Sequence, residues 1–265
     1  MTTHEFARQL ERAEAEVSLR CAAACQAAGA GVRVDAALGG WALDFGPDSP
    51  LSQILHAGMD GAVEEDEFAA VEERFFARGI ATTVSLCPYA HPTLIEILGR
   101  RGYRISHFEH TLQRHLDALP APPPPPHVRL ASGADWPACG EVLSEAFFPN
   151  GGAPPALRDL FATLFNIEGA CARLATDEGV IASCGGVTLA GPIAVLAGDG
   201  TSPAHRGRGY QNQLIAARCA HALAHGATHA MACTLPGSSS QRNYERQGFR
   251  IAYTKALMVK EAPAR

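Results

Sequence analysis

The segment 203–212, with the sequence PAHRGRGYQN, constrains the fold most, because it joins two stretches of different hydrophobic periodicity. Residues 193–197 before it form a short, partly β-branched apolar run that is typical of a buried strand. After it, apolar residues recur at helical spacing and form one stripe, namely Leu214, Ile215, Cys219, Ala222 and Leu223. The segment is therefore predicted to be the loop of a strand–loop–helix unit.

The composition of this loop predicts an anion-binding site. The first N–H groups of a helix lack acceptors within the helix, and the helix dipole adds a partial positive charge at the same end. Gly207 and Gly209 allow unusual backbone angles and let the backbone approach a ligand closely. Arg206 and Arg208 supply charged donors that do not titrate. Phosphate oxygens would satisfy both kinds of donor.

Three kinds of loop bind phosphate in this way, and the residues around the glycines separate them. The phosphate-binding loop of nucleotide hydrolases needs Gly-Lys-Ser/Thr, which is excluded because Tyr-Gln follows Gly209. The dinucleotide fingerprint needs a third glycine where Asn212 stands, so the sequence disfavours it. The remaining pattern, [Q/R]-x-x-G-x-[G/A], resembles the pyrophosphate loop of the GNAT acetyltransferase superfamily. Arg206 and Gly209 match this pattern, whereas Gln211 departs from it.

A second motif follows in the order typical of that superfamily. A strand, a short helix and a last strand are expected over residues 227–235, 238–247 and 250–260. Tyr244 stands four residues before a Gly-Phe pair that begins at Gly248, and Ser240 stands where the family often has serine. Because both motifs occur in order, residues 127–262 resemble a GNAT domain.

The resemblance implies an acetyl-CoA-dependent N-acetyltransferase, in which a primary amine attacks the thioester directly in a ternary complex. Acetyl-CoA would be the co-substrate, and no metal is expected. Tyr244 would protonate the departing thiolate, and Asp199 would act on the acceptor amine. The residues expected to bind the cofactor are Asp199, Gly200 and Thr201 along the pantetheine arm, Arg206, Gly207, Arg208, Gly209, Tyr210, Gln211 and Asn212 at the pyrophosphate, and Ser240 and Asn243.

Alternatives remain open at this site. Asp199 could take a proton from the acceptor ammonium through a water, or it could fix the turn into Gly200. Tyr244 could stack or pack instead of acting as an acid. A different class of protein, a CoA-binding sensor or assembly module without catalysis, fits the same motifs. A nucleotide-binding module is disfavoured by the missing lysine.

Composition restricts the class of protein further. With 265 residues and 47% hydrophobic content, the chain can bury two ordinary cores. It has no apolar run of about 18 residues and no signal-peptide pattern after Met1, so we expect a cytoplasmic protein that does not enter a membrane. The net charge of −5 argues against a nucleic-acid partner. The acceptor is expected to be a small-molecule or peptide amine, and the oligomeric state stays open.

A proline run marks the expected domain boundary. Residues 120–126, with the sequence PAPPPPP, cannot join a helix or a central strand and should form a semi-rigid spacer of roughly 20 Å. This predicts a first domain over residues 1–119 and a catalytic domain over 127–265. A proline-rich ligand for an adaptor domain is the alternative function of such a run.

The first domain resembles a degenerate copy of the second. Residues 79–88, a short helix and an alternating run after Gly102 repeat the second half of the later domain. Where the copy would bind pyrophosphate, residues 60–66 carry carboxylates, which repel phosphate. Leu98 takes the place of Tyr244. A helix over residues 4–28 and a hairpin around glycines 39 and 40 precede this part. An unrelated α+β domain is the alternative.

The expected fold is therefore α/β, with two GNAT-like domains, each a mixed and mostly antiparallel sheet flanked by helices. Within the second domain, helices are predicted over residues 136–147 and 155–165, and strands over residues 128–130, 170–174, 180–189 and 193–199. In the family, the loop between these helices lines the acceptor pocket. In this chain that loop is residues 147–152, and Phe147 could form an apolar wall or belong to the core.

Other residues suggest chemistry but have a structural explanation. His221, His225 and His229 are spaced by four, as in a zinc site, but the glutamate of H-E-x-x-H is missing, so helix-end histidines are expected. Cys184 could be a nucleophile, but no activating base can be assigned to it, which favours a packed thiol. The eight cysteines show no zinc spacing and are expected to be reduced.

Overall fold

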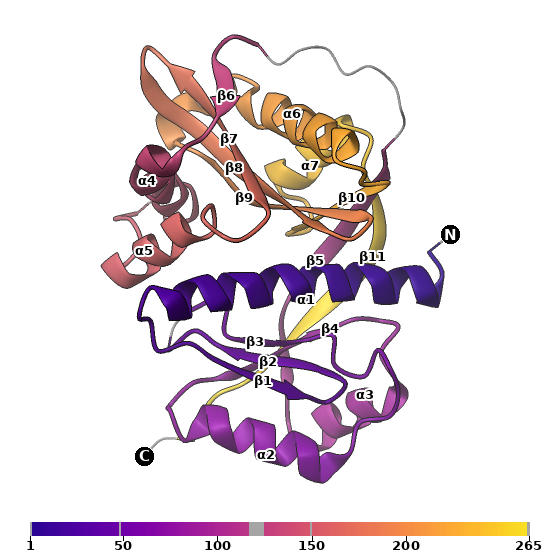
Figure 1. Cartoon of the computed structure of the whole chain (residues 1–265). Coiled ribbons are helices and arrows are strands. Elements are labelled where there is room, and N and C mark those ends of the chain that lie inside the picture. Colours follow the sequence, from indigo (N-terminus) through magenta and orange to yellow (C-terminus); the bar gives the residue numbers. More distant parts are fainter. Residues whose placement is uncertain (1, 48, 117–124, 149, 264–265) are drawn as a thin grey trace. The chain divides into compact units, whose positions relative to one another are not determined.

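A computed structural model describes residues 2–47, 49–116, 125–148 and 150–263 (Figure 1). The chain divides into two compact units. Unit 1 contains Met1–Thr111, Thr234–Pro236 and Ile251–Arg265, and unit 2 contains Leu112–Cys233 and Gly237–Arg250. Most of the predicted proline spacer, residues 120–124, lies outside the described residues.

Unit 1 begins with a long helix and contains a mixed sheet. Its elements are α1 (His4–Ala27), β1 (Arg33–Ala37), β2 (Gly40–Asp44), β3 (Gln53–Leu55), α2 (Glu65–Phe76), β4 (Thr82–Leu86), α3 (Pro92–Arg100), β5 (Arg104–His115) and β11 (Arg250–Lys260). The strand order is β1-β2-β3-β4-β11-β5. The predicted first helix and hairpin are confirmed, and the hairpin turn has positive φ angles of 61° at Leu38 and 72° at Gly39.

The last strand belongs to compact unit 1. This unit includes Ile251–Arg265, and the domain boundaries expected from the sequence, 1–119 and 127–265, stay a prediction. The strand joins this unit through pairing, because β11 forms an antiparallel ladder with β4 from Ala256 opposite Leu86 to Lys260 opposite Thr82. Conversely, β5 begins in unit 1 and its residues from Leu112 onward belong to unit 2.

Unit 2 contains a sheet with helices attached to both of its faces. Its elements are β6 (Val128–Leu130), a 3₁₀ turn η1 (Gly133–Asp135), α4 (Trp136–Phe147), α5 (Pro155–Thr163), β7 (Ala170–Asp177), β8 (Val180–Ala190), β9 (Ile193–Thr201), a 3₁₀ turn η2 (Pro203–His205), α6 (Tyr210–Ala224), β10 (His229–Thr234) and α7 (Ser239–Arg246). The order is β10-β9-β8-β7-β6, antiparallel except for β9 and β10. The predicted fold class and the predicted elements are confirmed.

Alternation along the strands divides the apolar side chains of unit 2 into two cores. On β7, Cys171 packs in a cluster that contains Ile215 of α6, and the next residue, Ala172, packs in a cluster that contains Leu143 of α4. This follows from the period of two in a strand, which sends successive side chains to opposite faces. The helix α6 is thus fixed by its apolar stripe, which positions its amino end.

The carboxyl half of β9 carries a bulge. Cys184 of β8 lies opposite Gly200 of β9, but Gly186 lies opposite Ala197, so Gly198 and Asp199 together oppose Gly185. Gly198 has a φ of 67°, which favours glycine. A bulge of this kind re-aims a side chain next to a site. Among the described residues, no helix is both long and apolar enough to cross a membrane.

Candidate functional site

The predicted site lies where two parallel strands separate. The ladder between β9 and β10 joins Ile193–Val195 to His229–Met231, and both strands continue beyond it to Thr201 and Thr234. Their carboxyl ends lead into α6 and α7 respectively. In open α/β sheets, ligands bind outside the carboxyl ends of strands at such a point. The described ladder between the two strands ends at Val195 and Met231.

The amino end of α6 has the conformation that the glycines predict. Gly207 and Gly209 have φ angles of 79° and 82°, and a Cβ built at either residue would have no neighbour within 4 Å. Gly209 is the N-cap residue, and no side chain caps the helix. The first N–H groups of a helix have no acceptor within it, so those of Tyr210, Gln211 and Asn212 can face an anion.

The two arginines of the loop differ in their partners. Arg206 is exposed and donates to the backbone oxygens of Thr201 at 3.4 Å and Ala146 at 3.1 Å, so its charge faces no carboxylate there. Arg208 forms an ion pair with Asp177, which partly neutralises it. Arg206 is therefore the stronger attractant for an anion at this loop.

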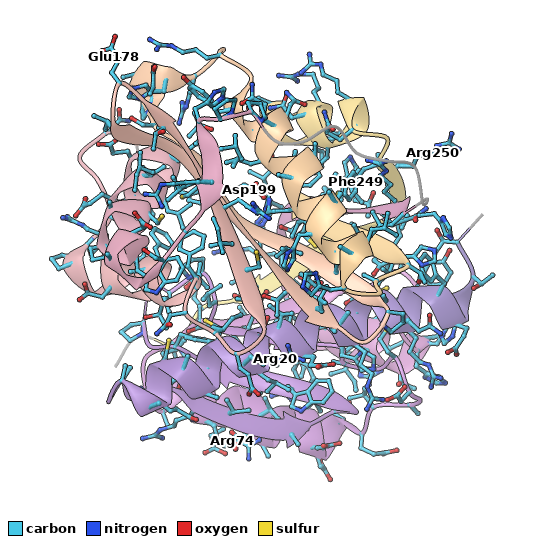
Figure 2. All side chains as sticks on the ribbon, turned by 45° about the horizontal axis from the view of Figure 1, so that its top comes forward. Arg20, Arg74, Glu178, Asp199, Phe249 and Arg250 are labelled. Atoms are coloured by element: carbon cyan, nitrogen blue, oxygen red, sulfur yellow. The ribbon has the colours of Figure 1, made fainter. Side chains whose placement is uncertain are left out.

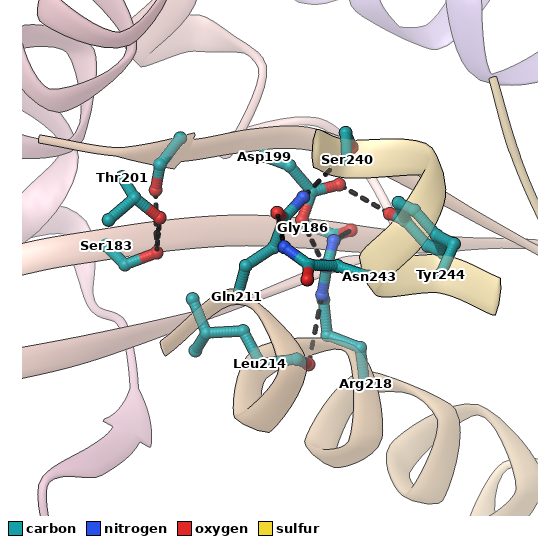
Figure 3. Close-up of polar contacts among 11 residues, drawn as sticks. Ser183, Gly186, Asp199, Thr201, Gln211, Leu214, Arg218, Ser240, Asn243 and Tyr244 are labelled. Carbon is teal, nitrogen blue, oxygen red and sulfur yellow. Dashed lines mark hydrogen bonds and ion pairs between the residues drawn. The ribbon is translucent and has the colours of Figure 1, made fainter. Parts of the chain in front are cut away.

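A network of amide side chains joins the amino ends of α6 and α7 (Figure 3). Gln211 donates to the Ser240 hydroxyl at 3.0 Å and accepts from Asn243 at 2.7 Å. Asn212 donates to the Oδ1 atom of Asn243 at 3.1 Å. Four residues predicted to bind the cofactor thus lie together, although they come from two motifs about 30 residues apart in the sequence.

Asp199 and Tyr244, the two predicted catalytic residues, are in direct contact. The Tyr244 hydroxyl donates to Oδ2 of Asp199 at 2.5 Å, and the tyrosine side chain is buried (Figure 3). The pKa of Tyr244 is raised well above its ordinary value. Burial is the largest cause, and the negative charge of Asp199 is the second. The hydroxyl therefore stays protonated at neutral pH, and its hydrogen bond holds the carboxylate in place.

Arg218 completes this buried group and was not among the residues predicted from the sequence. Its guanidinium forms an ion pair with Oδ1 of Asp199 and donates to the backbone oxygens of Leu214 at 3.2 Å and Gly186 at 2.8 Å. The side chain is fully buried, which acts to lower its pKa, but the charge of Asp199 outweighs this effect and raises the pKa. The sequence contains a feature that could have indicated this residue. Arg218 is a charged residue within the apolar stripe of the helix, four residues after Leu214.

Glycine makes room for the buried ion pair. A Cβ at Gly185 would lie 2.8 Å from the guanidinium carbon of Arg218 and 3.0 Å from Oδ1 of Asp199. Contacts below 3.0 Å are not tolerated without a shift of the neighbouring atoms. Gly185 also stands opposite the bulge of β9. The bulge and this glycine together position Asp199.

The predicted pantetheine-binding segment is held on its other edge by β8. The Ser183 hydroxyl donates to the backbone oxygen of Gly200 at 2.7 Å and lies 2.9 Å from the Thr201 hydroxyl. A Cβ at Gly200 would lie 2.7 Å from a methyl carbon of Leu143, so glycine lets α4 pack closely there. The backbone that would align pantetheine is thus fixed by sheet and helix contacts.

The loop after α4 presents aromatic side chains to solvent. Phe147 is 58% exposed and Phe148 is 37% exposed, and both rings lie near Phe161 with centroids 5.9 and 6.4 Å away. This exposure answers the question about Phe147, which does not belong to the core. Pro149 in this loop lies outside the described residues.

Cys184 and the histidines show the structural features expected of them. Cys184 is buried, and burial raises the pKa of its thiol well above the ordinary value, so it is not a thiolate. The rings of His221 and His225 lie 4.0 Å apart, and burial lowers the pKa of His221. All eight cysteines are free thiols.

Comparison with known proteins places part of unit 2 in a known family model and the fold among known structures. Residues 136–249 match the model of the Acetyltransferase (GNAT) family. The fold is similar to that of a GCN5-related N-acetyltransferase from Kribbella flavida, with a TM-score of 0.66. The two sequences are 20% identical, and the match covers 98% of this chain and 96% of that one. A GCN5-related N-acetyltransferase from Sphaerobacter thermophilus has 17% identity, coverage of 76% and 67%, and a TM-score of 0.58.

A third similar structure has two such domains. It is a tandem GNAT protein from the clavulanic acid biosynthesis pathway, with 15% identity, coverage of 80% of this chain and 75% of that one, and a TM-score of 0.56. No curated protein matches the sequence. Residues 136–249 therefore match the GNAT domain that the two motifs predict, and the fold of the chain is similar to that of GNAT structures, a tandem GNAT protein among them. This fold supports acyl-CoA-dependent acetyl transfer in general.

Proposed function

We propose that unit 2 is an acetyl-CoA-dependent N-acetyltransferase that transfers an acetyl group to a primary amine. The observation that carries this proposal is the uncapped, glycine-led amino end of α6 beside the point where β9 and β10 separate. A helix end of this kind binds phosphate through its N–H groups and its dipole. Asp199 lies near the end of β9, which leads toward α6, and Tyr244 lies on α7, which follows β10.

The residues of unit 2 fit acetyl-CoA as a co-substrate. We infer that the N–H groups of residues 210–212 hold the pyrophosphate together with Arg206, whose charge faces no carboxylate in its described contacts. The edge of β9 that faces β10 would pair with pantetheine from Asp199 to Thr201, as its other edge pairs with β8. Ser240 and Asn243 would complete the site by orienting Gln211.

The proposed reaction needs positioning and two proton transfers. The amine nitrogen attacks the thioester carbonyl, a C–N bond forms, the C–S bond breaks, and CoA leaves as a thiolate. The ammonium proton would pass to Asp199 through a water, and Tyr244 would protonate the thiolate. An unperturbed thiol has a pKa of about 8.5 and leaves readily, so placement contributes more than the acid does.

The acid role requires a movement of Tyr244. If its hydroxyl lost a proton in the described position while Asp199 was still ionised, a tyrosinate and the Asp199 carboxylate would lie side by side with one guanidinium, that of Arg218. Two adjacent anions in a buried site are unfavourable. The hydroxyl must therefore turn away from Asp199 before it can donate to the thiolate.

Replacement of Tyr244 by phenylalanine tests this role. We expect Tyr244→Phe to lower kcat about tenfold or more with little change in the KM for acetyl-CoA, because the hydroxyl acts on charge that develops in the transition state. Steady-state kinetics with a fixed amine gives both constants. Tyr253→Phe is the matched control, because Tyr253 of unit 1 is also buried and donates to a carboxylate, that of Glu11 at 2.7 Å. A kcat within about twofold, or ~0.4 kcal/mol, would assign Tyr244 a structural role.

A CoA-binding sensor without catalysis is the second candidate function. The hydrogen bond of Tyr244 to Asp199 favours it, since both predicted catalytic groups already satisfy each other. Release of free CoA thiol in the presence of a panel of amines separates the candidates. We expect release that depends on both acetyl-CoA and an amine, whereas tight CoA binding without release would support the sensor.

We propose further that residues 1–119 are a degenerate GNAT copy that binds no CoA. At the helix start that corresponds to α6, the first turn of α2 contains Glu65, Asp66 and Glu67. These carboxylates stabilise the helix through its dipole but repel a pyrophosphate. Leu98, which takes the place of Tyr244, is buried and offers no hydroxyl.

A further inference from the structure

Unit 2 contains a pocket of about 580 Å³ that the proposed acetyltransferase site does not use. Its lining comes from the end of β5, the end of α7 and the start of β11, namely Gln113, Arg114, His115, Arg246, Gln247, Gly248 and Arg250. None of these residues belongs to the proposed acetyl-CoA site. The volume lies within the range of small-molecule pockets, about 300–1,000 Å³.

The lining is strongly basic. It contains three arginines and a histidine but no aspartate or glutamate, although the whole chain carries a net charge of −5. Within the described part of the chain, no carboxylate forms an ion pair with Arg114, Arg246 or Arg250. A concave surface of one sign of charge concentrates ligands of the opposite sign.

The end of α7 explains part of this charge but not all of it. Arg114 donates to the backbone oxygen of Gln247 at 2.8 Å, which satisfies a carbonyl at the helix end. Gly248 beside it has a φ of 81°, a conformation that favours glycine. A helix end carries only about half a negative charge, whereas the three arginines carry three positive charges. More than two positive charges therefore remain at the pocket after the helix end is taken into account.

The three arginines are also held in different ways. Arg114 is fixed by Gln247, and Arg246 donates to Oδ1 of Asn243 at 2.7 Å. Arg250 is exposed at the surface and has no acceptor among the described contacts (Figure 2). Two preorganised guanidinium groups and one free group can together satisfy several oxygens of a single anion, and planar guanidinium groups suit phosphate in particular.

We propose that this pocket binds a small, multiply charged phosphate compound, independently of the pyrophosphate loop of α6. Inorganic pyrophosphate is a suitable probe. Because the loop itself should also bind it, the titration is done on the full chain in the Arg206→Glu background. In that background we expect one remaining pyrophosphate site. Adding Arg250→Glu should weaken this site about tenfold or more at low ionic strength, because an attraction is replaced by a repulsion.

Two further variants keep the test interpretable. Arg242→Glu makes the same charge change on α7 at an exposed arginine that does not line the pocket, and we expect it to leave the affinity within twofold. Arg114→Gln should also weaken binding, with circular dichroism to confirm folding. The proposal is overturned if the Arg206→Glu chain binds no pyrophosphate. It is also overturned if Arg250→Glu weakens binding no more than Arg242→Glu does. Binding of citrate as tight as that of pyrophosphate would overturn the preference for phosphate.

Discussion

Replacing Arg218 by methionine is expected to lower the free energy of unfolding by about 3–5 kcal/mol, since it leaves the Asp199 carboxylate without its cation. Arg218 is fully buried and makes an ion pair with Asp199 and two hydrogen bonds to backbone oxygens. Methionine has a similar length but satisfies none of these groups. Chemical denaturation of the purified chain, followed by circular dichroism, measures the difference.

The control variants separate loss of charge pairing from loss of packing. Arg242→Met removes an exposed arginine of α7 and should change stability by less than about 0.5 kcal/mol. The double variant Arg218→Met, Asp199→Asn removes both charges and should recover part of the loss, because no unpaired ion remains. A single variant as stable as the parent, or a double variant less stable than the sum of its parts, would contradict this account of the buried pair.

Replacing Arg206 by glutamate is expected to weaken acetyl-CoA binding about 100-fold, which is ~2.7 kcal/mol. The change places a carboxylate against the pyrophosphate where a guanidinium stood, at the loop whose other arginine is already paired with Asp177. The helix end and its N–H groups remain, so the fold should not change. Isothermal titration calorimetry of the full chain gives the affinity.

Arg33→Glu is the matched control for net charge. Arg33 is exposed in β1 of unit 1, and the variant changes the charge of the chain by the same amount. We expect its affinity for acetyl-CoA to equal that of the parent. If Arg206→Glu binds within about threefold of the parent, the loop does not hold the pyrophosphate.

Local patterns predicted most of the elements of unit 2. The helix α4 runs over residues 136–147 and β6 over 128–130, as expected, because hydrophobic period and turn residues are properties of neighbouring positions. The partner of β11 could not be predicted in this way. Its sequence alternates as a strand should, but its place in the sheet depends on pairing with β4, which is far away in the sequence.

The site likewise contains some features that depend on neighbouring residues and others that depend on contacts between residues far apart in the sequence. The conformations of Gly207 and Gly209 follow from the residue type and from their place before a helix. The pairing of Arg208 with Asp177 and that of Tyr244 with Asp199 depend on tertiary contacts between separate elements. Arg218 was the one residue that the pattern could have revealed, because a charge on an apolar helix stripe needs a buried partner.

A crystal structure of the full chain with acetyl-CoA tests the central claim most directly. We expect the pyrophosphate within hydrogen-bonding distance of the N–H groups of Tyr210, Gln211 and Asn212, with Arg206 beside it. We also expect the pantetheine arm along the edge of β9 that faces β10, and the thioester between β9 and β10 near Asp199. Acetyl-CoA bound elsewhere on the chain, or no bound acetyl-CoA at millimolar concentration, would contradict it.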